Sequence, residues 1–118
     1  MRLPLIALTT LLAAGCVAAP LEAAVPDGAD LVVVAEDIYF EPERIEVPEG
    51  EVLALHLRND GGIVHDLVFE DGWESGDIAP GGSATLEFGP FSASTIAWCS
   101  IPGHRDAGME LEVVVLAD

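Results

Sequence analysis

The segment CSIPGHRDAGM, from Cys99 to Met109, concentrates side chains that bind soft metal ions. It holds one of the two cysteines of the 118-residue chain, one of its three histidines and its only methionine besides Met1. Thiolate, imidazole and thioether groups suit copper or zinc, whereas calcium and magnesium take oxygen ligands. We therefore predict a metal site in which Cys99, His104 and Met109 converge at one end of the fold.

A further ligand has to come from His56 or His65. His56 lies between Leu55 and Leu57 in the alternating segment EVLALHLRN, so its ring should face solvent on the opposite side of the strand from the core. His65 follows the turn residues NDGG and begins a short apolar segment. It can therefore lie at the same end of the domain as the Cys99 loop, and we favour it over His56.

The predicted ligands match a type 1 copper site, which has three close ligands and one weak thioether. The close ligands are His65, Cys99 and His104, and the axial ligand is Met109. Ordinary structural roles remain open for each residue: a buried cysteine, a surface or loop histidine, or a methionine that fills the core. A structural zinc ion is an alternative occupant, although zinc usually takes a stronger fourth ligand than a thioether.

The elements that would position these residues are short strands. Apolar residues alternate with polar ones from Leu31 onward, and turn residues such as VPEGE, NDGG, EDG and APGG separate the apolar segments. No helical period of useful length is present. The expected strands are Leu31 to Glu36, Arg44 to Val47, EVLALHLRN, His65 to Phe69, Ser83 to Phe88, Ser94 to Cys99 and ELEVVVLAD. The pattern predicts an all-β Greek-key sandwich or barrel of about seven to eight strands.

The N-terminal residues predict export. Residues 1–15 have the character of a signal peptide, and LLAAGC is typical of lipoprotein processing with Cys16 as the lipidated N-terminus. Simple removal of the signal, or a Cys16–Cys99 disulfide in an uncleaved chain, are the alternatives. Residues 16–29 predict a flexible tether, and residues 30–118 one folded domain. We expect a location in the periplasm or on the outer face of the cytoplasmic membrane.

The charge balance limits the partners. The chain has 21 acidic residues against four arginines and no lysine, a formal net charge of −17. Such a field disfavours nucleic acid and anionic lipid surfaces, so membrane contact is expected only through a lipid anchor. It favours basic redox partner proteins or reflects a saline habitat. We expect a monomer.

Two stretches together resemble the cupredoxin family of small blue copper proteins, which includes plastocyanins, azurins and auracyanins. The resemblance covers Leu31 to Leu116. The first stretch, YFEPERIEVPEGEVLALHLRNDGGIVHDLVF, carries the family pattern through Phe40, Pro42, Ile45, Val47, Gly50, Asn59 and His65. The second, WCSIPGHRDAGM, is similar to the family's loop from cysteine to methionine. Four residues separate Cys99 from His104 and four separate His104 from Met109, a spacing similar to that of auracyanins.

The resemblance implies that His65, Cys99, His104 and Met109 bind copper, and it also shows departures. Trp98 stands where plastocyanins carry a surface tyrosine implicated in remote electron transfer. Asp66 stands where many members have asparagine, so its hydrogen bond toward Ser100 should be altered in strength. Relatives often have aromatics where this chain has Thr95 and Ala97, and GMELEV lacks the glycine that is common soon after the methionine.

The expected function is that of a one-electron carrier between redox proteins of the cell envelope, using Cu(I) and Cu(II). We do not expect an enzyme, since no nucleophile–base pair, carboxylate pair or second metal site stands out. Apolar and small residues of the loop predict a docking patch around His104: Ile101, Pro102, Gly103, Ala107 and Gly108. A module for copper storage or delivery is the alternative function.

Overall fold

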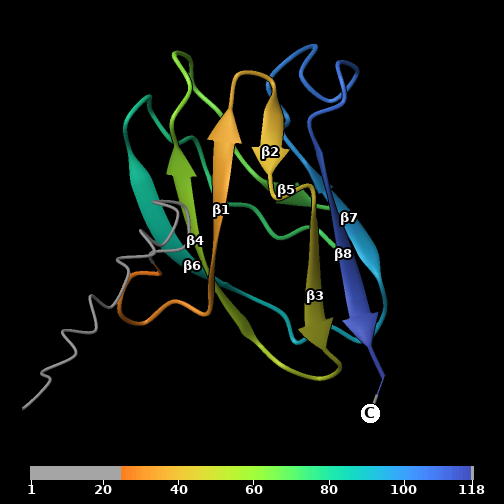
Figure 1. Cartoon of the computed structure of the whole chain (residues 1–118). Coiled ribbons are helices and arrows are strands. Elements are labelled where there is room, and N and C mark those ends of the chain that lie inside the picture. The colour runs from red at the N-terminus through yellow and green to blue at the C-terminus, as the bar shows by residue number, and fades with distance from the viewer. Residues whose placement is uncertain (1–24, 118) are drawn as a thin grey trace, which may run out of the picture.

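The structure is a computed structural model that describes residues 25–117, and within this range every regular element is a β-strand (Figure 1). The strands are β1 (Leu31–Glu36), β2 (Tyr39–Glu41), β3 (Arg44–Pro48), β4 (Leu53–Asn59), β5 (Val68–Phe69), β6 (Ser83–Phe88), β7 (Thr95–Trp98) and β8 (Glu110–Leu116). Across residues 25–117 no helix has the length and apolar character needed to cross a membrane.

The eight strands form two four-stranded sheets, in the orders β2-β1-β4-β6 and β3-β8-β7-β5. The pairs β1–β4 and β3–β8 are parallel, and the other neighbouring pairs are antiparallel. The sheets pack face to face with the hydrophobic core between them. The predicted all-β sandwich is confirmed.

Strand β4 shows why the alternating sequence folds in this way. Its burial alternates at every residue, and Leu53, Leu55 and Leu57 all face the core. Burying each leucine stabilises the fold by about 1.5 to 3 kcal/mol relative to an exposed position. The intervening His56 lies on the outer face, where its Nδ1 is 2.8 Å from the hydroxyl of Thr85 on β6. The prediction that His56 points away from the core is confirmed.

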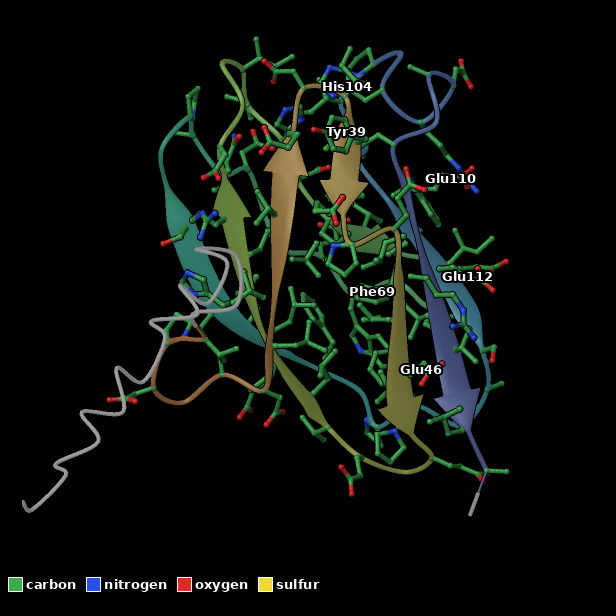
Figure 2. All side chains as sticks on the ribbon, viewed as in Figure 1. Tyr39, Glu46, Phe69, His104, Glu110 and Glu112 are labelled. Carbon is green, nitrogen blue, oxygen red and sulfur yellow. The ribbon has the colours of Figure 1, made fainter. Side chains whose placement is uncertain are left out.

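A cluster of aromatic side chains fills part of the core between the sheets. The ring of Phe69 on β5 lies 4.5 Å from that of Phe88 on β6 and 5.9 Å from that of Phe91, measured between centroids. Trp73 packs edge-on against both Phe69 and Phe91. Such pairs add about 0.5 to 1.5 kcal/mol each beyond the area they bury. Figure 2 shows Phe69 in the middle of the molecule.

The observed strands match most of the predicted ranges. Leu31–Glu36 and Ser83–Phe88 agree with the expected bounds, whereas the three-residue strand Tyr39–Glu41 was not predicted. The segment expected as a strand from His65 to Phe69 is a strand only at Val68–Phe69. His65 instead pairs through a single bridge with Ile78. The predicted signal peptide, Cys16 and most of the predicted tether lie outside the described residues.

Three connecting segments gather at one end of the sandwich, opposite the C-terminus (Figure 1). They are the turn between β1 and β2, the segment that follows β4, and the long loop between β7 and β8. The predicted metal-binding residues lie in the second and third of these segments, so this end of the fold is where the site forms.

Candidate metal centre

His65, Cys99 and His104 meet at this end of the sandwich. One ligand atom from each lies within 4.8 Å of the others. The Cys99 sulfur is 3.8 Å from Nδ1 of His65 and 3.4 Å from Nδ1 of His104. His65 and Cys99 have no exposed surface, and His104 is 7% exposed. The structure thus brings together the three residues predicted as close ligands.

These separations fit one metal ion between the three atoms. Bonds of about 2.3 Å to a thiolate and about 2.0 Å to an imidazole place the two donor atoms about 3.5 to 3.7 Å apart at tetrahedral to trigonal angles. The two sulfur–nitrogen distances of 3.4 and 3.8 Å bracket that range. The donors therefore need little movement to bind an ion.

The backbone around His65 is held by Asn59, a fully buried residue at the end of β4. Its side-chain amide donates to the carbonyl oxygens of Ile63 and Ile78, both at 2.8 Å. Its side-chain oxygen accepts from the backbone N–H of Gly61 at 2.9 Å. His65 exchanges two backbone hydrogen bonds with Ile78. The Asn59 side chain therefore connects the turn before His65 to Ile78, the bridge partner of His65.

The far side of the His65 ring contacts Asp37, in the turn between β1 and β2. Oδ1 of Asp37 lies 2.8 Å from Nε2 of His65, and Oδ2 accepts from the backbone N–H of Gly62 at 2.8 Å. The hydrogen bond from Gly62, followed by that from His65, lowers the pKa of Asp37. Because Nε2 faces the carboxylate, Nδ1 of His65 is the nitrogen that faces Cys99.

Cys99 follows β7 directly and is fixed by backbone hydrogen bonds. Its N–H donates to the carbonyl of Met109 at 3.1 Å, and its sulfur accepts from the N–H groups of Asp66 and Ile101. Burial raises the pKa of the Cys99 thiol and outweighs the two N–H groups, which lower it. A bound cation would reverse this balance, because metal-bound cysteine is the thiolate.

Asp66 links the two halves of the site. Its carboxylate is almost fully buried and accepts from the backbone N–H of Ser100 at 2.6 Å and from the Ser100 hydroxyl. The predicted contact between Asp66 and Ser100 is therefore present, with a carboxylate accepting both bonds.

The loop that carries His104 is a succession of tight turns. The N–H of His104 donates to the carbonyl of Ile101, and the N–H of Met109 donates to the carbonyl of His104. Arg105 holds the loop against the sheet, since its guanidinium lies 3.9 Å from the centre of the Trp98 ring and 3.5 Å from a carboxylate oxygen of Glu110. Within residues 25–117, no protein group forms a hydrogen bond with Nε2 of His104.

Met109, the predicted axial ligand, is fully buried and belongs to the core. Its backbone is bonded to both Cys99 and His104, at 3.1 Å in each case. This places the residue at the same end of the fold as the three-residue cluster, while its ligand role stays a prediction.

Sequence reasoning missed the supporting residues rather than the predicted ligands. Asp37 received no role, because an acid in a turn of an acidic chain is not distinctive and its partner His65 lies 28 positions away. Asn59 was noted only as part of a pattern. The turn between Asn59 and His65 was the available signal, because a buried asparagine before a glycine turn usually satisfies backbone groups.

The amino-acid sequence matches the cupredoxin-like domain family over residues 5–114. The chain therefore belongs to this family. A curated relative, the copper-resistant cuproprotein CopI of Pseudomonas aeruginosa, is 24% identical over an alignment that covers 70% of this chain and 74% of CopI.

Solved structures with the same fold include small copper proteins. Reduced auracyanin from Roseiflexus castenholzii superposes with a TM-score of 0.65 at 18% identity, covering 72% of this chain and 94% of auracyanin. A mutant of amicyanin gives 0.59 at 22% identity, covering 80% and 89%. A multicopper oxidase gives 0.61 at 23% identity, covering 80% of this chain but 45% of the oxidase. At these identities the likeness concerns the fold.

Family and donor set together identify the cluster as a type 1 copper site. One thiolate and two imidazoles converge in a buried position, and a methionine follows in the same loop. Copper is the metal that this combination favours, since the thioether is a poor fourth ligand for zinc.

Proposed function

We propose that this protein is a one-electron carrier, in which His65, Cys99 and His104 are the close ligands of one copper ion and Met109 is the weak axial ligand. The observation that carries the proposal is the preformed arrangement of the three close ligands, with two nitrogens 3.8 and 3.4 Å from one buried sulfur. When bound, copper supplies a one-electron couple between Cu(II) and Cu(I).

The protein keeps the ligands in place during that exchange. His65 is bonded to Ile78 and Asp37, and Cys99 is bonded to Met109 and through its sulfur to Asp66. Groups that are held by the surrounding fold need little rearrangement when the charge at the site changes. A small rearrangement favours fast electron transfer.

His104 is the route by which we propose that electrons leave. It is the one cluster residue with exposed surface, and its Nε2 is not covered by a hydrogen bond from the described residues. Exposed apolar side chains at this end of the sandwich come from the turn between β1 and β2, the first residue of β2 and the segment after β4: Ile38, Tyr39, Ile63 and Val64. Figure 2 shows Tyr39 and His104 at the same end. With Ile101 and Pro102 they supply an apolar surface on which a redox partner can dock.

The acidic charge favours a basic partner. Glu46 on β3 and Glu110 and Glu112 on β8 are spaced along one sheet (Figure 2). Glu110 and Glu112, together with Glu43 and Glu70, surround the exposed Ile96, two residues from Trp98. Such a field would accelerate the approach of a positively charged protein. We propose a monomer that works in the cell envelope, with its N-terminus lipidated at Cys16 or released after signal removal.

A copper-handling role is the second candidate, and the named relative CopI, a copper-resistant cuproprotein, favours it. Delivery sites need ligands that exchange readily. Here two of the three close ligands have no exposed surface, which favours retention of the ion and hence electron transfer.

The test is electron exchange of the copper-loaded protein with a basic c-type cytochrome, followed by stopped-flow absorbance. The carrier role predicts second-order reduction in both directions and retention of copper against a mild chelator. Rapid transfer of copper to the chelator, with slow exchange of electrons, would favour delivery. A colourless protein that binds zinc in preference to copper would indicate a structural zinc site.

A further inference from the structure

The turn between β1 and β2 contributes a carboxylate that no ligand prediction includes. Asp37 lies immediately after β1, and its side chain spans from the surface to the site. It is 45% exposed, whereas the His65 side chain that it contacts is fully buried. One oxygen faces Nε2 of His65 and the other accepts from the N–H of Gly62, each at 2.8 Å. Both carboxylate oxygens are therefore used in holding this position.

Gly61 leaves the space that this contact needs. A Cβ on residue 61 would overlap with Oδ1 of Asp37 and would lie 2.9 Å from Nε2 of His65. The N–H of Gly61 is meanwhile held by Asn59. The turn before His65 is thus shaped to admit a carboxylate against the far side of the imidazole ring.

The chemistry of this pair follows from the position of the proton. A neutral imidazole carries one N–H, and a carboxylate beside Nε2 retains the proton there, which leaves the Nδ1 lone pair free for a metal. Carboxylate, histidine and metal in this order orient the ring and make it a stronger donor. Negative charge near the ion also favours Cu(II) over Cu(I), since the oxidised ion carries one more positive charge.

We propose that Asp37 is a positioning residue for the copper site, which sets the tautomer of His65 and lowers the reduction potential of the bound copper. This inference rests on the proposed function, because it concerns the same ion. It gives the two histidines different roles. His65 is the anchored and charge-stabilised ligand, and His104 is the ligand that faces the partner.

Three variants separate the charge of Asp37 from its contact. Asp37→Asn removes the charge and keeps an oxygen that can accept from His65. Gly61→Ala keeps the charge but forces the carboxylate of Asp37 and the ring of His65 apart, because the added Cβ would press on both. Glu36→Gln is the matched control, since it removes one negative charge at the neighbouring position, where the side chain has no hydrogen bond or ion pair with His65.

The measurements are the reduction potential by protein-film voltammetry and the coupling of the remote imidazole nitrogens by pulsed EPR of the Cu(II) protein. Asp37→Asn should raise the Cu(I) to Cu(II) ratio about tenfold at a fixed ambient potential, equal to about 59 mV for one electron. Gly61→Ala should shift the potential in the same direction. In both variants one of the two remote nitrogens should change its coupling. Glu36→Gln should alter the ratio by less than about twofold, because the partly exposed Glu36 carboxylate makes no hydrogen bond or ion pair with a ligand and solvent ions screen its charge.

The outcomes keep the two proposals apart. If the wild-type protein shows the colour and potential of a type 1 site while Asp37→Asn shifts the potential no more than Glu36→Gln, the role of Asp37 is wrong and the carrier role is unaffected. If Asp37→Asn does not fold, Gly61→Ala decides, and an unchanged potential in that variant overturns the inference. If wild-type protein forms no type 1 site, both proposals fail.

Discussion

The carboxylate of Asp66 accepts hydrogen bonds from both the backbone N–H and the side-chain hydroxyl of Ser100. Asp66 follows His65, and Ser100 follows Cys99, so this pair joins the segments that carry two of the three clustered ligands. The contact joins residues 34 positions apart and is partly buried, with Asp66 almost fully buried and Ser100 exposed. It places a negative charge close to the Cys99 sulfur, and this charge favours Cu(II) over Cu(I).

Asp66→Asn should raise the reduction potential of the copper-loaded protein. Removing a buried negative charge beside the site favours Cu(I), and we expect about a tenfold change in the Cu(I) to Cu(II) ratio, equal to about 59 mV. Voltammetry at neutral pH measures it. Ser100→Ala is the control, since it removes one donor and leaves the charge in place. A reduction potential in Asp66→Asn at or below that of wild type would show that the charge of Asp66 does not stabilise Cu(II).

The apo-protein should lose stability as the pH rises above the pKa of an unfolded cysteine, about 8.5. Burial raises the pKa of Cys99 in the folded chain, so the unfolded state releases this proton first. Unfolding then becomes more favourable by up to about 1.4 kcal/mol per pH unit, until the folded thiol also ionises.

Urea unfolding of metal-free, reduced protein between pH 7 and about 10 measures this effect against the pKa range of cysteine. Cys99→Ala is the matched variant, and the difference in unfolding free energy between wild type and variant isolates the thiol. The difference should be constant below the unfolded pKa and should fall above it. A difference that stays flat to the highest pH would show that the folded thiol titrates normally.

Gly89→Ala should destabilise the fold by about 3 kcal/mol or more, because it combines a strained backbone with a clash. Gly89 has φ of +115°, and a Cβ there would meet the carbonyl oxygen of Glu51 at 2.8 Å and the Cα of Val52 at 3.2 Å. Gly81 has φ of +78° with nothing within 4 Å, so Gly81→Ala should cost only about 1 to 2 kcal/mol. Thermal unfolding of both variants tests the prediction, which fails if the two lose equal stability.

Charge reversal on the acidic sheet should slow electron exchange with a basic partner. Glu112→Lys changes a residue of β8 close to Ile96, whereas Glu87→Lys makes the same change of charge on β6 in the other sheet. We expect Glu112→Lys to lower the second-order rate several-fold at low salt and Glu87→Lys to have a smaller effect. Added salt should slow the wild type and reduce the difference. Equal effects of the two variants would mean that net charge acts without a preferred face.

The strands and the clustered residues could be predicted because they follow local patterns. The alternation in EVLALHLRN determines that Leu55 faces the core and His56 does not, whatever the rest of the chain does. Cys99, His104 and Met109 share one loop and need no long-range argument. His65 required one step more, the expectation that a turn would bring it to the same end of the sandwich.

The other features of the site could not be predicted, because they depend on contacts between residues far apart in the sequence. The bridge between His65 and Ile78 replaces part of a predicted strand, because its hydrogen bonds join residues 13 positions apart across a loop. Asp37 reaches His65 only because β1 pairs with β4 and ends beside the turn that follows it. Nothing in the sequence distinguishes Asp37 from the other acidic residues, of which the chain has 21 in total.

The visible absorption spectrum of the oxidised, copper-loaded protein, compared with that of Cys99→Ser, decides whether Cys99 is the thiolate ligand of a type 1 copper ion. We expect an intense thiolate-to-copper charge-transfer band toward the red end of the spectrum in the wild type. The band should be absent from Cys99→Ser and should bleach on adding one electron per copper. A wild-type protein that holds one Cu(II) per chain and shows no such band would mean that the site is not type 1 copper.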